Sequence, residues 1–186
     1  MIEAWPSMKS QPSCPSPIQE PRSSLLPCKR LVSPRRWDLA VKWRFFRHLL
    51  HGGDSDAGRI YRWHIETRKG ANASLGLGMD SKSGADAYVS DCHRLLVSIR
   101  ANGFLASHAI PIDPDGELLG GAHRVACSLA LGLEEIPVRD EMRRVWAPAW
   151  DEAWFRSNGM GADDLERVRQ DMSIIELNDH SHPRRP

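Results

Sequence analysis

The chain has 186 residues and a formal net charge of +1, with 25 Lys and Arg residues against 24 Asp and Glu residues. This length suits one domain with tails, and the near-neutral charge excludes a global field that would draw the protein to nucleic acid or a membrane surface. No apolar run reaches the roughly 20 residues of a membrane span. The N-terminus lacks the apolar segment of a signal peptide, so we expect a cytoplasmic protein.

The four cysteines, Cys14, Cys28, Cys92 and Cys127, do not have the spacing of a zinc site. Cys92 and Cys127 fall in predicted helices, where we expect them to be small buried residues. In this context a disulfide framework is not expected either. We therefore expect neither disulfides nor a metal site built from Cys and His.

The N-terminal part divides into two segments. Residues 1–35 are rich in Pro, Ser and basic residues, and they bury too little apolar surface to offset the entropy of ordering, so we predict a disordered tail. Residues 36–57 form an amphipathic helix and a loop, because residues 37–51 place apolar side chains at helical spacing with cations between them. Such a helix either packs on the domain, which we favour, or touches a membrane or an acidic partner.

Residues 58–140 have the pattern of one α/β domain. Residues 59–65 partly alternate between apolar and polar side chains, which predicts a strand, and a glycine-bearing loop follows at residues 69–80. An apolar face at helical spacing predicts a long helix over residues 87–101. Two short strands around a Pro-Asp-Gly turn are then predicted at residues 109–112 and 117–119.

The rest of the chain is predicted to be mainly helical. A helix over residues 123–131 precedes a short strand over residues 136–138, in which Pro137 suggests an edge position. Residues 141–178 form a predicted helical extension with helices at 151–156 and 162–172, and residues 179–186 form a polar tail.

The most informative segment is Gly120-Gly-Ala-His-Arg124, which joins the end of a strand to the start of a small-residue helix. Two glycines let a backbone approach a ligand closely, because neither has a Cβ and both reach positive φ. The first turn of a helix offers N–H groups and the positive end of the dipole. His123 and Arg124 add donors suited to phosphate oxygens, so the segment predicts a phosphate-binding turn.

This motif resembles the nucleotide-binding signature of the ParB/sulfiredoxin superfamily, in which Gly-Gly-Cys-His-Arg, Asp-Gly-His-His-Arg or Gly-Glu-Arg-Arg stands at the same strand–turn–helix position. The order of the flanking elements is similar to that of the ParB-like nuclease domain over roughly residues 58–140. The resemblance implies an α/β fold of the ParB/sulfiredoxin type with a small mixed sheet and terminal helices. It also implies a nucleotide held by Gly120, Gly121, Ala122, His123 and Arg124.

The motif departs from the family at two positions. Ala122 stands where sulfiredoxins have their reactive Cys, so we expect no sulfiredoxin activity. Gly120 stands where the free-serine kinases of the superfamily have an Asp close to the reacting groups. A kinase built on this chain therefore needs another carboxylate to accept the hydroxyl proton.

Glu66 is the candidate for that carboxylate, because it precedes the long helix, as a catalytic Glu does in those kinases. Asp80 and Glu117 are the alternatives, and His123 is the other candidate catalytic residue. Lys82 lies in a loop that often contacts the nucleotide in this family. It is either a phosphate ligand or a solvated loop lysine.

Together the motif and the resemblance lead us to expect a kinase-like phosphotransferase that uses ATP or another nucleoside phosphate with Mg²⁺. The acceptor would be a small hydroxylated metabolite such as an amino acid, a sugar or a polyol. The alternative is a ParB-like regulatory or DNA-associated module that binds CTP or ATP without turnover. The chain after residue 140 is too short for a recognition domain plus a dimerisation domain, so we expect no sequence-specific binding to nucleic acid.

Overall fold

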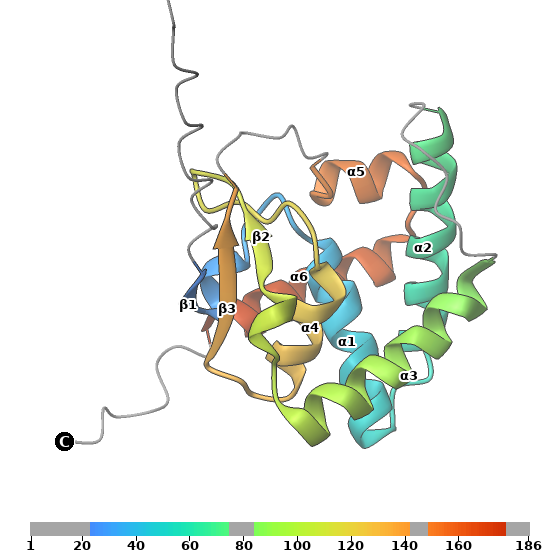
Figure 1. Ribbon diagram of the computed structural model, residues 1–186. Coiled ribbons are helices and arrows are strands. Elements are labelled where there is room, and N and C mark those ends of the chain that lie inside the picture. The colour runs from blue at the N-terminus through green and yellow to red at the C-terminus, as the bar shows by residue number, and fades with distance from the viewer. Residues whose placement is uncertain (1–22, 75–83, 142–148, 178–186) are drawn as a thin grey trace, which may run out of the picture.

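The computed structural model describes residues 23–74, 84–141 and 149–177 (Figure 1). In these ranges the chain is a mixed α/β structure with six α-helices and a three-stranded sheet. The helices are α1 (Asp38–His51), α2 (Ala57–Ser74), α3 (Gly84–Asn102), α4 (Ala122–Ala130), α5 (Glu152–Ser157) and α6 (Ala162–Leu177). The strands are β1 (Ser23–Pro27), β2 (Ile110–Ile112) and β3 (Glu135–Asp140), and short 3-10 helices lie at Cys28–Leu31 and Ala106–His108.

The sheet is mixed and has the strand order β1-β3-β2. Along its whole length β1 pairs antiparallel with β3, whereas β2 pairs parallel with β3 and places Ile110 opposite Val138. A parallel pair needs a crossover connection between its strands. Here that connection contains α4, so β2, α4 and β3 form a βαβ unit in which α4 lies beside the sheet (Figure 1).

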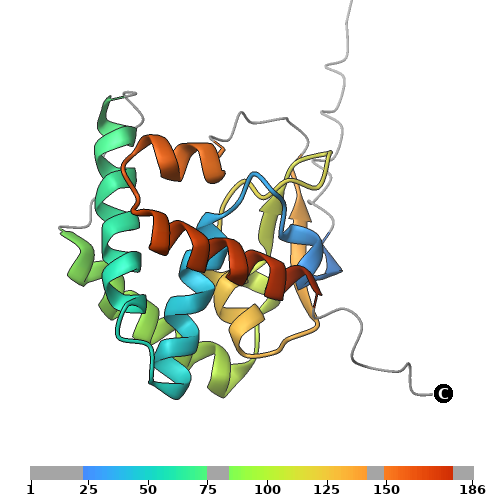
Figure 2. The same ribbon diagram turned by 180° about the vertical axis from the view of Figure 1, so that it is seen from behind.

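α1 is the central helix of the structure and packs against α2, α3, α4 and α6. Figures 1 and 2 show α3 and α6 on opposite sides of α1. Leu39, Val41 and Phe46 of α1 are at most 1% exposed. The predicted helix over residues 37–51 is therefore confirmed, and it belongs to the interior rather than to a surface that would meet a membrane.

The predicted strand over residues 59–65 is wrong, because these residues lie inside α2. Ile60, Tyr61, His64 and Ile65 are all buried, and their spacing is that of one helix face. His64 is a polar member of this face. A pattern read from apolar residues alone therefore misses the helical period.

The predicted disorder of residues 1–35 is wrong for the part from residue 23 onward. β1 adds to the sheet there, and the amide of Cys28 donates to the carbonyl of Glu134 at 2.9 Å. The side chains of Cys28 and Leu31 are 1% and 2% exposed. Composition cannot reveal that β3 offers an open edge to this segment. The remainder of the predicted tail lies outside the described residues.

Two smaller expectations about strands also need correction. β3 is the middle strand, so Pro137 does not mark an edge, because β1 supplies the second neighbour. The predicted strand over residues 117–119 is reduced to one bridge between Leu118 and Ile112, because the chain turns at Gly121 directly into α4. The other predicted helices are confirmed, and they are α3, α4, α5 and α6. Among the helices described, none combines the length and hydropathy that a membrane crossing requires.

Candidate functional site

Gly121 forms the turn that starts α4. It is the N-cap residue of this helix, with a left-handed φ of 82°. A Cβ on Gly121 would lie 2.7 Å from Cδ1 of Ile110 and 2.9 Å from Nη2 of Arg124, closer than real contacts allow. Gly120 lacks a positive φ, and its added Cβ would lie 3.6 Å from Cγ of Pro111, an ordinary contact. Of these two positions, only 121 requires a glycine, because of both its backbone conformation and the space around it.

The first turn of α4 contains Ala122, His123 and Arg124, and all three residues are half-buried. The amides of the first turn have no hydrogen-bond acceptor within the helix, and they lie at the positive end of the helix dipole. The guanidinium of Arg124 donates to the carbonyl of His108 and lies over Gly121. Burial, together with the nearby cation of Arg139, lowers the pKa of Arg124. An anion beside this turn would relieve that repulsion.

His123 is held by two tyrosines from different helices. Its Nε2 lies 2.8 Å from the hydroxyl of Tyr61 on α2, and its ring stacks on Tyr88 of α3 with centroids 6.0 Å apart. The Tyr61 hydroxyl also lies 3.1 Å from Sγ of Cys92. Burial and the neighbouring Cys92 raise the pKa of Tyr61, so its phenol stays protonated and can either donate to Nε2 of His123 or accept from it, according to the tautomer of the ring. The imidazole is therefore fixed in orientation at the start of α4.

Behind this turn, a buried polar seam lies between α1 and α2, and we use this name for Arg36, Asp38, Lys42 and His64. The Lys42 ammonium lies 2.5 Å from Oδ2 of Asp38. The Arg36 guanidinium donates to both carboxylate oxygens of Asp38, at 2.8 and 3.0 Å. All four residues are less than 9% exposed. One carboxylate thus serves two buried cations.

The charges in the seam depend on one another. Burial alone would raise the pKa of Asp38, but Lys42 and Arg36 outweigh burial and hold that pKa well below its usual value. Burial lowers the pKa of Lys42 to about 8, although Asp38 opposes the effect. Burial and the charge of Lys42 together push the pKa of His64 far below its usual value. At neutral pH the seam therefore holds a carboxylate, two cations and a neutral imidazole.

Contacts on two sides connect the seam to the glycine turn. Nη1 of Arg36 donates to the carbonyl of Leu118 at 2.8 Å, just before the two glycines. On α2, Tyr61, His64 and Arg68 share one helix face, and Arg68 donates to the hydroxyl of Tyr88 at 3.2 Å. Tyr61 and Tyr88 in turn hold His123. The seam and the first turn of α4 are parts of one polar region.

The structure brings together some of the residues that the sequence singles out and separates others. Gly120, Gly121, Ala122, His123 and Arg124 form the turn and the start of α4, as the motif predicts.

Glu66 does not join this group. It is exposed on α2, on the face opposite Tyr61 and His64. Lys82 and Asp80 lie outside the described residues, and Glu117 lies near Ser33, whose hydroxyl donates to it at 3.4 Å.

Sequence reasoning missed the seam and the two tyrosines. Asp38 and Lys42 are four residues apart on one face of α1, and Arg36 precedes them by two positions. That spacing is the available signal, but on a surface helix the same pair is common and contributes little. Only packing against α2 shows that the pair is buried.

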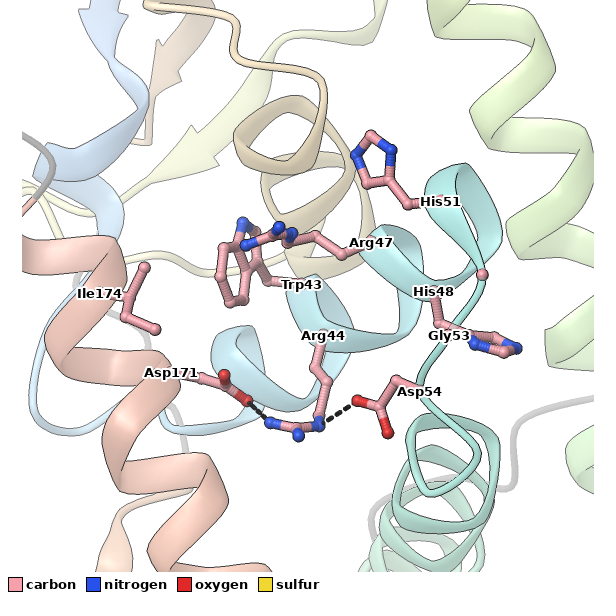
Figure 3. Close-up of a pocket in the computed structure, with 10 residues that line it drawn as sticks. Trp43, Arg44, Arg47, His48, His51, Gly53, Asp54, Asp171 and Ile174 are labelled. Atoms are coloured by element: carbon pink, nitrogen blue, oxygen red, sulfur yellow. Dashed lines mark hydrogen bonds and ion pairs between the residues drawn. The ribbon is translucent and has the colours of Figure 1, made fainter.

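A separate pocket of about 390 Å³ lies at the C-terminal end of α1, beside α6 (Figure 3). Asp54 and Asp171 converge there on Arg44 from opposite sides, each with an oxygen 2.7 Å from the guanidinium. Burial raises the pKa of Asp171 even though Arg44 opposes the effect. Arg44 thus ties α1 to α6 and to the loop before α2. We assign this junction a structural role.

Among the described residues, no cluster of three or more His, Cys, Asp or Glu side chains is arranged to hold a metal ion. The groups at the start of α4 are backbone amides, the guanidinium of Arg124 and the imidazole of His123, which suit an oxyanion rather than a cation. Comparison with protein-family models, with curated proteins and with solved structures finds no match for this chain.

Proposed function

We propose that this protein is a nucleotide-dependent phosphotransferase with a ParB/sulfiredoxin-type domain, acting on a small hydroxylated metabolite such as an amino acid, a sugar or a polyol. The observation that carries the proposal is the glycine turn at the start of α4. The buried cations Arg36 and Lys42, which share the carboxylate of Asp38, add positive charge to the interior. Amides of a helix start and nearby guanidiniums are the usual protein partners of phosphate oxygens.

In this proposal the turn from Gly120 to Arg124 binds the phosphates of ATP or a related nucleotide. Arg124 supplies charge, and Lys82 is a further candidate phosphate ligand. A Mg²⁺ ion would be carried mainly by phosphate oxygens and water, as this ion commonly is. Its role would be to neutralise charge on the transferred phosphoryl group.

Proton transfer from the acceptor hydroxyl is assigned to His123 rather than to Glu66. Glu66 is exposed on the far face of α2, whereas His123 lies at the turn itself and is oriented by Tyr61. Histidine is the side chain that most often acts as a general base at neutral pH. For Nδ1 to be the base in this assignment, Nε2 carries the ring proton and donates it to the Tyr61 oxygen.

The alternative function is binding of CTP or ATP without turnover. One observation favours it: among the described residues near the turn, the buried carboxylate Asp38 is fully engaged by Arg36 and Lys42. Its pKa is held well below the usual value, so Asp38 cannot accept a substrate proton. If His123 does not act as a base, the site binds nucleotide and performs no chemistry.

ADP formation from ATP and Mg²⁺, measured with a panel of amino acids, sugars and polyols, tests the proposal. We expect one acceptor class to stimulate ADP formation, and we expect Arg124→Ala to abolish it. Arg100→Ala is the matched control, because Arg100 is an exposed arginine of α3. Nucleotide binding with no stimulation by any acceptor would support the alternative. Stimulated turnover that survives Arg124→Ala would contradict the assignment of the site.

A further inference from the structure

The pocket between the C-terminal end of α1 and α6 has a negative and a positive side. Figure 3 shows Asp54, Arg44 and Asp171 in a row along one side, and Arg47 lying over Trp43 along the other. The two aspartates share one guanidinium, so this row carries one net negative charge. Arg47 is exposed, and its guanidinium carbon lies 5.0 Å from the ring centroid of Trp43. Arg47 thus gives the opposite side a positive charge.

The two aspartates are engaged to different extents. Oδ1 of Asp54 accepts the amides of Asp56 and Ala57, and its Oδ2 lies 2.7 Å from Nε of Arg44. Oδ2 of Asp171 accepts from Nη1 of Arg44 at 2.7 Å, whereas its Oδ1 has no hydrogen-bond partner in the described part of the chain. Asp171 is only 6% exposed. The pocket wall therefore contains a nearly buried carboxylate oxygen that can accept a hydrogen bond from a ligand.

The charges of Arg47 and Asp171 act on each other across the pocket, but within the described residues the two side chains form no ion pair. A ligand that joins them needs a cationic donor for Asp171 and an oxyanion for the fork of Arg47. Trp43 and Ile174 supply apolar surface beside these groups, and Ile174 is a large apolar residue that remains 41% exposed. The volume of about 390 Å³ lies in the range of sites for small molecules.

We propose that this pocket binds a free α-amino acid with an aliphatic side chain, such as leucine. The ammonium group lies on Oδ1 of Asp171, the carboxylate lies on the guanidinium of Arg47, and the side chain packs on Trp43 and Ile174. Arg44 keeps its structural role, because its donors are already engaged by the two aspartates.

A zwitterion is favoured over ligands of a single charge. The pocket contains two arginines and two aspartates, so a ligand with one charge of each sign leaves this balance unchanged. An anion that lacks an ammonium group leaves Oδ1 of Asp171 without a donor and is repelled by both carboxylates. A cation that lacks a carboxylate is repelled by both arginines and leaves Arg47 without an oxyanion.

The pocket is separate from the glycine turn. Its walls come from α1, from α6 and from the loop before α2, and they include no residue of the turn at 120–124. The inference therefore does not rest on the proposed function. An amino acid bound there would contact both α1 and α6, and it would stabilise the folded protein by mass action.

Isothermal titration of the full chain with leucine at neutral pH tests the inference, together with two analogues that each lack one charged group. Leucinamide keeps the ammonium group, and isocaproate keeps the carboxylate. We expect leucine to bind saturably and each analogue to bind at least about tenfold more weakly, because each leaves one charged hydrogen bond unmade. Thermal unfolding should shift upward with leucine and much less with the analogues.

Arg47→Gln removes the partner of the carboxylate at an exposed position, so the variant keeps its fold. We expect it to weaken leucine binding by about tenfold or more and to leave the weak binding of leucinamide unchanged. Arg100→Gln, at an exposed position of α3, is the matched control and should bind leucine as the parent protein does.

Three results would overturn the inference. The first is the absence of saturable leucine binding at millimolar concentration, and the second is equal binding of leucine and either analogue. The third concerns Arg124→Ala, which should lose nucleotide binding under the proposed function but keep leucine binding. Leucine binding that is lost in Arg124→Ala and kept in Arg47→Gln would place the amino acid at the glycine turn instead.

Discussion

At the scale of single residues, Gly121 is a position where the backbone conformation and the neighbouring side chains both restrict which residue can be present. We expect Gly121→Ala to lower the free energy of unfolding by about 1 to 3 kcal/mol, because a left-handed φ of 82° and a clash with Ile110 both oppose the new Cβ. Displacing Ile110 or Arg124 would also move the start of α4. Urea denaturation and ADP titration of the variant measure the two effects.

Gly120→Ala is the matched comparison for this substitution. Its Cβ would meet only Cγ of Pro111 at 3.6 Å, and its backbone has no positive φ. We expect its effect on stability to stay within about 0.5 kcal/mol. Equal losses of stability in the two alanine variants would show that the turn does not depend on the left-handed conformation of Gly121.

Asp38 is the second residue for which the structure predicts a specific effect of substitution on stability. Asp38→Asn removes the carboxylate that serves Arg36 and Lys42, and leaving buried charges without a partner costs about 3 to 5 kcal/mol. The folded-state pKa of Asp38 lies below its unfolded value, so its contribution is fully present above about pH 4. As the pH falls further, through the folded-state pKa, the contribution is lost. The stability difference between the two proteins should therefore shrink in acid.

Chemical denaturation of both proteins between neutral and acidic pH measures that difference. Asp86→Asn is the control, because Asp86 forms an exposed ion pair with Arg62 and such pairs contribute little. A difference that stays constant as the medium is acidified would mean that the ionised form of Asp38 does not stabilise the fold.

The sequence predicts the turn at Gly121 and the start of α4 at the level of individual residues, because glycine at a helix start has a direct conformational meaning, and phosphate binding there stays a prediction. It does not predict the seam. Asp38, Lys42 and His64 are polar, and only tertiary packing determines whether a polar side chain on a helix faces water or a neighbouring helix. The burial that lowers the pKa of Lys42 has no local signal.

At the scale of elements, the same reason explains the error at α2. The face that packs on α1 contains His64 and Arg68 among its apolar residues, so hydrophobic periodicity alone points to a strand. α3 and α4 are predicted correctly because apolar or small residues fill their buried faces.

The composition of residues 23–27 does not predict a strand, and β1 forms because this segment pairs with β3. A chain that begins at residue 33 lacks β1 and the buried residues Cys28 and Leu31. We expect it to lose at least about 2 kcal/mol of unfolding free energy, because burying one Leu side chain alone contributes about 1.5 to 3 kcal/mol. Thermal unfolding of the truncated and parent proteins measures the loss.

A chain that begins at residue 23 keeps β1 and is the control for this truncation. We expect its unfolding free energy to stay close to that of the parent protein. If the chain that begins at residue 33 is equally stable, then β1 contributes nothing to the fold, and the disorder predicted for the whole N-terminal tail would be the better description.

At the scale of the whole molecule, α1 organises the structure. It packs against α4 and α2, and Phe45 of α1 stacks on Tyr61 of α2 with ring centroids 4.2 Å apart. Arg36 of the seam bonds the carbonyl of Leu118 just before the glycine turn, although the two come from segments more than 70 residues apart. The mixed α/β class follows from the sequence, whereas this meeting of turn and seam follows only from the packing of α1.

The central claim is that the turn from Gly120 to Arg124 binds the phosphates of a nucleotide. Thermal unfolding with and without nucleoside diphosphates and triphosphates in the presence of Mg²⁺ measures it most directly. At a ligand concentration of 100 times Kd, we expect about 2.7 kcal/mol of added stability, and we expect Arg124→Ala to lose it. Unfolding that is unchanged by every nucleotide at millimolar concentration would contradict the claim.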